Sequence, residues 1–251
     1  MSDGGQPLVS IITVVRNGAA GIGRTLDSVA AQAGVSHEHL VIDGASSDGT
    51  LNILKQHQGH HLRWISEPDG GIYEAMNKAV ALSRGEWLLF LGADDALADQ
   101  NVLTEVLVEN DLSGYDLVCG VSRFDDGRRY VSRLDWRINV FNTIHHQAAF
   151  YRRSLFDEFR YRTDIPVTAD YELNYRVRRQ NRNILFLDRD VAICGSRGIS
   201  HTTSQFAAQS ELFKARSRYI NPPANFALLL IGLANVVATR IRRPSTAPGQ
   251  S

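Results

Sequence analysis

The sequence has few of the features that mark extracellular, zinc-binding or nucleic-acid-binding proteins. Its two cysteines, Cys119 and Cys194, lie in apolar stretches without metal-binding spacing, which argues against a disulfide framework and favours a reducing, cytosolic setting. The 27 basic and 27 acidic residues give a net charge of zero, so the charge balance indicates no nucleic-acid partner. Residues 1–7 are polar and glycine-rich, unlike the apolar centre of a secretory signal. The chain shows no internal repeat, and its composition becomes biased only after Arg243.

What the chain does have is an alternation of short apolar runs and segments with helical periodicity. With 43% hydrophobic residues it can bury one large core, or a core and a small subdomain. Apolar runs predict strands at residues 8–15, 40–42, 62–65 and 87–91, and helical spacing predicts a helix after each of the first three. Strands that alternate with helices imply an α/β fold in three layers, in which helices flank a mostly parallel central sheet.

An acidic pair, Asp94 and Asp95, follows the apolar run at 87–91. Ligands of open α/β sheets bind beyond the carboxyl ends of the strands, so these two side chains are well placed for chemistry. Adjacent carboxylates repel each other unless a cation or hydrogen bonds hold them, and Mg²⁺ or Mn²⁺ prefers such oxygen ligands. The alternative is that one of the two merely caps a helix that begins near Asp99.

Acidic residues also follow the second and third predicted strands. Asp43 ends the second and Asp69 the third, and parallel strands bring their carboxyl ends to one edge of the sheet. For Asp69, and for Asp48 before Gly49, ordinary turn formation explains the acid equally well. Acidic ends on several strands of one sheet nevertheless favour a functional site at that edge.

Three glycines after the first strand, at positions 18, 21 and 23, leave a second enzyme class open. They open a helix as a dinucleotide-binding fingerprint does, but their spacing is G-x-x-G-x-G and not G-x-G-x-x-G. Asp43 lies where the fingerprint places a ribose-binding acid. A Rossmann-type enzyme that uses a dinucleotide or a methyl donor therefore stays an alternative.

The order of the motifs resembles that of the inverting family 2 glycosyltransferases, which use nucleotide-sugar donors and adopt the GT-A fold. The resemblance covers residues 8–200; each motif is weak alone, whereas their order is specific. The segments that carry it are 13–17, 43–50, 67–77, 92–95, 146–147 and 168–171. The chain departs from the commoner family pattern at Gly92 and Ala169, where an acidic residue is more usual.

The resemblance implies roles for individual residues. Asp170 would be the catalytic base, and Asp95 would bind a divalent cation, Mg²⁺ or Mn²⁺, that holds the donor diphosphate. Asp43 would accept a hydrogen bond from a ring N–H of the nucleotide base. The other donor-binding residues would be Thr13, Val15, Asn17, Asp69, Gly70 and Asp94, with Asp94 facing the ribose or the metal. Without the resemblance, the dipole of a helix that begins near Thr168 would explain Asp170 by itself.

The second half of the chain is less periodic. Residues 117–131 predict a strand and a hairpin around an Asp-Gly turn. Residues 142–150 predict a further strand, in which the adjacent His145 and His146 point to opposite faces and do not easily serve one ion. We expect His146 to hydrogen-bond the substrate or to pack locally.

The last segment has a different character. Residues 226–238 form a nearly continuous apolar run, shorter than the roughly twenty residues that a membrane span needs. Such a run favours a helix that lies on an anionic membrane surface, whereas the alternative is a helix docked on the core or on a second subunit. His201, which precedes the run, is a further candidate for the metal site. The basic residues that flank the run are Lys214, Arg216, Arg218, Arg240, Arg242 and Arg243.

These expectations combine into one hypothesis. The enzyme moves a sugar from a nucleoside-diphosphate sugar to a hydroxyl of a glycan or lipid-linked acceptor, at the cytoplasmic face of the membrane, in cell-envelope polysaccharide or glycolipid synthesis. A catalytically silent sugar-nucleotide-binding protein is the remaining alternative. The predicted catalytic domain spans 1–200, with a nucleotide-binding half at 7–110 and an acceptor-binding half at 111–200, followed by a helical segment at 201–243 and a disordered tail at 244–251.

Overall fold

The computed structural model describes residues 5–57, 59–195 and 204–242. The strands are β1 (Val9–Val15), β2 (His37–Asp43), β3 (Leu62–Ser66), β4 (Trp87–Phe90), β5 (Ala96–Leu97), β6 (Leu117–Phe124), β7 (Arg129–Val131), β8 (Ala149–Arg152) and β9 (Ile184–Cys194). The α-helices are α1 (Ile22–Ala30), α2 (Thr50–Gln56), α3 (Ile72–Leu82), α4 (Val102–Leu107), α5 (Ala169–Arg179), α7 (Gln205–Arg216) and α8 (Pro222–Arg242), and the 3₁₀ helices are η1 (Trp136–Asn139), η2 (His146–Ala148) and η3 (Arg153–Phe156).

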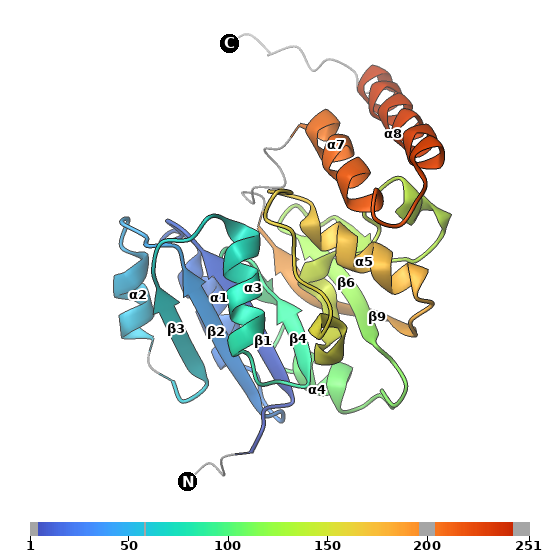
Figure 1. The fold of residues 1–251 in the computed structure, drawn as a ribbon. Coiled ribbons are helices and arrows are strands. Elements are labelled where there is room, and N and C mark those ends of the chain that lie inside the picture. Colours follow the sequence, from blue (N-terminus) through green and yellow to red (C-terminus); the bar gives the residue numbers. More distant parts are fainter. Residues whose placement is uncertain (1–4, 58, 196–203, 243–251) are drawn as a thin grey trace, which may run out of the picture.

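These elements form one mixed sheet with helices on both faces (Figure 1). The strands follow the order β3-β2-β1-β4-β8-β6-β9-β5, and β7 pairs with β6 outside this path. The pairs β3–β2, β2–β1 and β1–β4 are all parallel, so their carboxyl ends meet at one edge. The predicted alternation of strand and helix in the first half is confirmed.

The second half of the sheet differs from this regular pattern. Strand β8 runs antiparallel to both β4 and β6, and β5 runs antiparallel to β9, whereas β6 and β9 are parallel. The α/β class with flanking helices is confirmed, and the parallel arrangement is a property of the first four strands. The predicted hairpin is also present, because β6 and β7 pair antiparallel around a turn in which Gly127 has a φ of +84°.

One strand prediction was wrong. The segment with the two histidines does not continue β8 backwards, because His146–Ala148 forms the short helix η2 and the strand begins only at Ala149. Alternating polarity in so short a stretch did not distinguish a 3₁₀ turn from a strand. The two imidazoles therefore do not point to opposite faces of a sheet, and both line the same cavity.

The core lies in layers on the two sides of the sheet. Leu88 and Phe90 of β4 pack with α3 and α5, whereas Trp87 and Leu89 pack on the opposite face with α1 and α4. All four side chains are buried, so β4 is covered on both faces as its continuous apolar run predicts. This central strand holds the turn that follows it, at residues 91–95, in a fixed position.

Helices α7 and α8 form a pair that stands beside the sheet and continues the layer of α5 (Figure 1). Helix α7 lies between α5 and α8 and contacts both. Its Glu211 accepts hydrogen bonds from the backbone N–H of Thr168 (2.8 Å) and of Val167 (3.2 Å), directly before α5 begins. The C-terminal helices are therefore attached to the helix that carries Asp170.

Candidate active site

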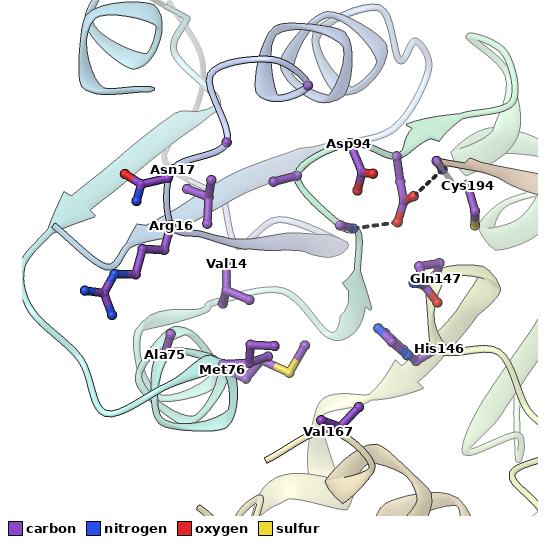
Figure 2. A pocket seen from close by; sticks show the side chains of 18 of the residues that line it. Val14, Arg16, Asn17, Ala75, Met76, Asp94, His146, Gln147, Val167 and Cys194 are labelled. Carbon is purple, nitrogen blue, oxygen red and sulfur yellow. Dashed lines mark hydrogen bonds between the residues drawn. The ribbon is translucent and has the colours of Figure 1, made fainter. Parts of the chain in front are cut away.

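A cavity of about 590 Å³ opens beyond the carboxyl ends of β1 and β4. Its walls come from the loop after β1, the start of α3, the turn after β4, helix η2 and the end of β9 (Figure 2). A concave site at this edge of an α/β sheet is where such folds bind ligands. Four of the predicted donor-binding residues line the cavity, namely Val15, Asn17, Asp69 and Asp94, and so does the predicted metal ligand Asp95.

The Asp95 carboxylate is folded back onto its own turn. Its Oδ2 accepts a hydrogen bond from Gly92 N (3.0 Å) and its Oδ1 from Gly195 N (2.9 Å), and the residue is only 3% exposed (Figure 2). A Cβ at position 92 would lie 2.4 Å from Asp95 Oδ2, so a larger residue there would require the Asp95 carboxylate to shift. Neither acid caps the following helix, since the N-cap position of α4 is Asn101. The helix-cap alternative was wrong.

Burial raises the pKa of the Asp95 carboxyl, although the two backbone N–H groups partly oppose the shift. Burial therefore destabilises the ionised Asp95 carboxylate, and a bound cation would offset this destabilisation. Asp94 lies beside it, half-buried on the cavity wall. Among the described residues no group of three His, Cys, Asp or Glu side chains could hold a metal ion. The pair fits a hard cation that takes its other ligands from water and substrate phosphates. His201 lies outside the described residues.

Two loops on the donor side are tied to each other by hydrogen bonds. Asn17 Oδ1 accepts from Ser47 N (2.9 Å), and Asp48 Oδ2 accepts from Ala19 N (2.9 Å). Asp48 also accepts from the Thr50 hydroxyl (2.6 Å), so its role is to shape the turn before α2. Hydrogen bonds therefore join the loops after β1 and β2 into one wall, to which the exposed Arg16 adds a positive charge.

Three predicted donor-binding residues do not line the cavity. Asp43 is fully buried, and its Oδ2 accepts from the Ser66 hydroxyl (2.6 Å), while its Oδ1 has no partner among the described residues. Thr13 Oγ1 lies 3.0 Å from Nε2 of His39, an imidazole whose pKa burial lowers to about 3. Gly70 stands at the surface, where its N–H donates to Glu74 (3.1 Å).

Asp170 sits in the first turn of α5 at the centre of a polar network drawn from distant parts of the chain. The Tyr73 hydroxyl lies 3.0 Å from Oδ1, Asn142 Nδ2 donates to Oδ2 (2.7 Å), and His146 Nδ1 is 3.5 Å from Oδ2. Burial alone would raise the pKa of the Asp170 carboxyl, but His146 and the Tyr73 hydroxyl outweigh it and hold this pKa below its ordinary value. A helix dipole does not account for these contacts.

The partners of Asp170 were not predictable from the sequence. Tyr73 and His146 both lie in segments that resemble the family, yet no role was assigned to Tyr73 and only a general one to His146. Asn142 had no signal, because a single asparagine before an apolar run is ordinary. Only the packing of α3 and η2 against α5 brings these side chains together.

The glycines at positions 18 and 21 have a structural role in the turn before α1. Gly18 O accepts hydrogen bonds from Gly21 N and Ile22 N, each at 3.0 Å, which starts the helix. Both glycines line the cavity. Their spacing is therefore explained by the turn, without the glycine roles of a dinucleotide fingerprint.

Comparison with known proteins agrees with this geometry. The family model of glycosyl transferase family 2 matches residues 10–180. A "PGL/p-HBAD biosynthesis glycosyltransferase" of Mycobacterium tuberculosis is 37% identical over 185 residues, which cover 68% of this chain and 69% of the relative. An uncharacterized glycosyltransferase of Rickettsia typhi is 26% identical over 233 residues, which cover 84% and 70%.

Solved structures with the same fold are more distant in sequence. TarS of S. aureus in complex with UDP has a TM-score of 0.68 and 19% identity, over 93% of this chain and 73% of the TarS chain. A mannosyltransferase of Pyrobaculum calidifontis, in complex with GDP-Man and Mn²⁺, has a TM-score of 0.66 and 19% identity, over 96% and 77%. The matched family model, the identity to the mycobacterial relative and the shared fold agree: this chain is a glycosyltransferase that belongs to glycosyl transferase family 2.

Proposed function

We propose that the cavity transfers a sugar from a nucleoside-diphosphate sugar to an acceptor hydroxyl, with inversion at the anomeric carbon. The observation that carries this proposal is the chemistry of its two walls. Asp94 and Asp95 stand on one wall, and His146 with Asp170 behind it stands on the other. A bound cation stabilises a departing diphosphate, and a proton acceptor activates an attacking hydroxyl. The wall with Asp94 and Asp95 would hold the cation, and the wall with His146 and Asp170 would accept the proton.

The donor would lie along the wall formed by the loops after β1 and β2. Asn17 and Val15 border this part of the cavity, and the unpartnered Oδ1 of Asp43 is an acceptor suited to a ring N–H of the base. The UDP in one TarS structure, the UDP-GlcNAc in another and the GDP-Man in the mannosyltransferase support a nucleotide-sugar donor for this chain as well. Uracil and guanine both offer such an N–H.

Asp95 and Asp94 would hold Mg²⁺ or Mn²⁺. The bound cation supplies positive charge to the diphosphate as it departs. The Mn²⁺ in the mannosyltransferase structure supports this assignment, and so does the buried Asp95 carboxylate, whose charge has no cationic side chain bonded to it among the described residues.

The reaction is a single displacement. The acceptor oxygen attacks the anomeric carbon from the face opposite the diphosphate. The bond between that carbon and the diphosphate oxygen breaks, and its electron pair stays on the diphosphate. The acceptor proton passes to the wall formed by His146 and Asp170. Because one bond forms as the other breaks, the configuration inverts without a covalent intermediate.

A thermal-shift panel combined with a transfer assay tests this function. Nucleoside-diphosphate sugars with Mn²⁺ should stabilise the protein, by about 2.7 kcal/mol at a hundredfold excess over Kd. The ligand that stabilises should also release its nucleoside diphosphate when acceptor is added. Asp126→Asn, in the exposed hairpin turn, is the control and should match the parent. Binding without turnover would indicate a silent binding protein, and stabilisation by dinucleotides alone would indicate the Rossmann alternative.

The C-terminal helix supports a lipid-linked acceptor. Helix α8 packs on α7 with Asn225, Gly232 and Val236, whereas Phe226 and Leu230 are 55% and 51% exposed. The exposed apolar face, with the arginines at 240, 242 and 243 following it in the sequence, fits an anionic membrane surface. Helix α8 is longer than the apolar run alone, and the segment Pro222–Thr239 is long and apolar enough to cross a membrane by length and composition. We place it on the surface because one of its faces is occupied by α7.

Vesicle sedimentation tests the membrane proposal. The parent should sediment with vesicles of phosphatidylglycerol, and a Phe226→Ser/Leu230→Ser variant should bind at least about tenfold more weakly, since each buried apolar side chain is worth about 1.5–3 kcal/mol. Val108→Ser, which also removes an exposed apolar side chain but lies after α4, is the matched control. A parent that stays in solution and forms dimers that the double variant abolishes would assign this face to a second subunit. Extraction that needs detergent would instead indicate a spanning helix.

A further inference from the structure

The buried position of Asp170 makes it dependent on its hydrogen-bond donors. Asp170 is 8% exposed, and burial by itself raises the pKa of its carboxyl. A general base has to be ionised before it can take a proton. It also has to keep one orientation, because a misplacement of about 1 Å costs on the order of a hundredfold in rate. The side chains that bond to this carboxylate therefore bear on both requirements.

Asn142 makes the shortest side-chain contact to Asp170 among the described residues. Its Nδ2 donates to Asp170 Oδ2 at 2.7 Å, whereas the Tyr73 hydroxyl lies 3.0 Å from Oδ1. An asparagine side chain has a donor end and an acceptor end, and only the donor end stabilises an ionised carboxylate. If the amide were turned around, its oxygen would face Oδ2 and repel it. The direction of the Asn142 amide is therefore decisive.

A chain of buried groups fixes this direction. Asn142 Oδ1 accepts from Asn174 Nδ2 (3.1 Å), and Asn174 Oδ1 accepts from the Tyr151 hydroxyl (2.9 Å). Both amides also contact the backbone of Ile144. Its N–H donates to Asn142 Oδ1 (3.4 Å), and its carbonyl oxygen accepts from Asn174 Nδ2 (3.5 Å). A backbone N–H can only donate and a carbonyl oxygen can only accept, so these contacts hold both amides in one orientation.

We propose that Asn142 is a positioning residue for Asp170 and that Asn174 and Tyr151 hold it in place. This inference rests on the proposed glycosyl transfer, in which Asp170 takes the acceptor proton and the diphosphate leaves with the electron pair of the broken bond. None of the three positioning side chains is among the described residues that line the cavity, so they act through Asp170. The chain begins at Tyr151 in β8, which ties the base to the central sheet.

Asn142→Ala tests whether the amide matters for the rate. The variant should lower kcat by about tenfold to a hundredfold, because the carboxylate is no longer held on its Oδ2 side. The donor Kd, measured by calorimetry, should stay at the parental value and shows that the site is folded. Asn139→Ala is the matched control and should behave like the parent, since Asn139 is also partly buried but bonds to Trp136 and Tyr175 away from the cavity.

Asn142→Asp gives a readout that a purely structural role would not change. The variant keeps the shape of the side chain but places a second carboxyl beside Asp170, and two carboxyls at hydrogen-bond distance share a proton. The pKa at which Asp170 becomes ionised therefore rises. The acidic limb of the kcat profile should move to higher pH by about one unit or more, and kcat should recover as the pH rises. Asn139→Asp should leave this limb at its parental position.

Other titratable groups also face the Asp170 carboxyl, and they are the same in the parent and in both variants. Burial raises the pKa of each tyrosine among them, so these hydroxyls stay neutral at and below neutral pH. The groups are Tyr73, Tyr130, Tyr151, Tyr161, His145 and His146. A shift between the parent and Asn142→Asp is therefore assigned to residue 142.

Tyr151→Phe tests the far end of the chain. It removes only the hydroxyl that bonds to Asn174, so kcat should fall by about fivefold with an unchanged donor Kd. In the Asn142→Ala background the same change should alter kcat by less than about twofold, because residues that act as a unit are not additive. Tyr175→Phe is the matched control, since it removes the hydroxyl of a buried tyrosine that bonds to Asn139 instead.

Three results would overturn the inference. The first is a folded Asn142→Ala enzyme with kcat within about threefold of the parent. The second is an Asn142→Asp enzyme that is slower by the same factor at every pH, and the third is a Tyr151→Phe effect of equal size in both backgrounds. Failure of the parent itself to transfer any sugar would contradict the proposed function instead, so the two failures are distinguishable.

Discussion

The two halves of the sheet place their functional residues in different ways. On the donor side each residue lies at or just after a parallel strand, and short contacts such as Asn17 to Ser47 join neighbouring loops. On the acceptor side the Asp170 network gathers Tyr73, Asn142 and His146 from segments up to 97 residues apart in sequence. Variants on the donor side should therefore change donor affinity or stability, and variants around Asp170 should change the rate of transfer.

The largest expected effect comes from Asp170→Asn. An amide cannot accept the acceptor proton as a carboxylate can, and it places an N–H₂ group beside Asn142, so the rate of transfer should fall by about 10²–10⁴. The donor Kd, measured by calorimetry, should stay at the parental value, because Asp170 does not line the donor wall. If donor affinity and rate fell together, donor binding and catalysis would not be separated between the two halves of the sheet.

Asp95→Asn should give the opposite pattern. The change removes the negative charge that would hold the cation, so Mn²⁺ should no longer strengthen donor binding, a loss of about a hundredfold at the upper end of what metal-site variants show. Titration calorimetry of the nucleoside diphosphate with and without Mn²⁺ measures the effect. Asp126→Asn serves as the carboxylate control. If Mn²⁺ strengthened binding of the nucleoside diphosphate equally in the variant and the parent, Asp95 would not be a metal ligand.

Glu38→Gln tests whether the first half is held together away from the cavity. Glu38 is 2% exposed, accepts hydrogen bonds from Ser10 (2.7 Å) and from the backbone N–H of Arg84 (2.6 Å), and pairs with Arg63. The free energy of unfolding should fall by about 1–2 kcal/mol, since the arginine partners are largely exposed and screened. The catalytic rate at 25 °C should not change.

The difference in unfolding free energy between the parent and Glu38→Gln should shrink as the pH falls. Burial opposes ionisation of Glu38, but its hydrogen bonds to Ser10, Arg84 and Arg63 hold its pKa below the ordinary value of 4.5. A carboxyl whose pKa is lower in the folded state contributes stability above its unfolded pKa and loses it as the pH falls. Denaturant unfolding should therefore show the full difference between parent and variant above about pH 4.5 and a shrinking difference at lower pH. A constant difference would contradict this account.

A small effect on the rate of transfer is expected for Glu211→Ala in α7. The variant removes the acceptor for Val167 N, Thr168 N and the Thr168 hydroxyl, which fix the start of α5. We expect a loss of about 1–2 kcal/mol in unfolding free energy and a fall of a few-fold, about three, in kcat with unchanged donor affinity. Glu109→Ala, at an exposed position after α4, is the control. An unchanged kcat would mean that the C-terminal helices do not help to position Asp170.

The same contrast explains what could be predicted from the sequence. The run before Asp94 is apolar and short, and it follows a segment with helical periodicity. Both features can be seen within a few residues of sequence, so the strand and the acidic turn after it were predictable. Asn142 and Tyr73 gave no such signal, because their role depends on three elements that meet only in the folded chain.

Which side of a helix is buried could not be predicted from the sequence either. Arg216 looked like part of the basic flank of the apolar run, but in the structure it is fully buried and bonds to Asn225 Oδ1 (3.0 Å) and to the carbonyl oxygen of Asn139 (2.9 Å). It is not available to lipid headgroups, and the exposed arginine in this stretch is Arg218, which pairs with Glu172. Charge counted along a sequence does not show which side of a helix faces the core.

The anomeric configuration of the product tests the central claim most directly. The account places one proton acceptor opposite one leaving diphosphate, with a single displacement between them. Proton NMR of the sugar product formed by the parent, read at early times from the coupling of the anomeric proton, should show the configuration opposite to that of the donor. Retention of the donor configuration would contradict the account, because retention does not result from a single displacement with the acceptor on the face opposite the diphosphate.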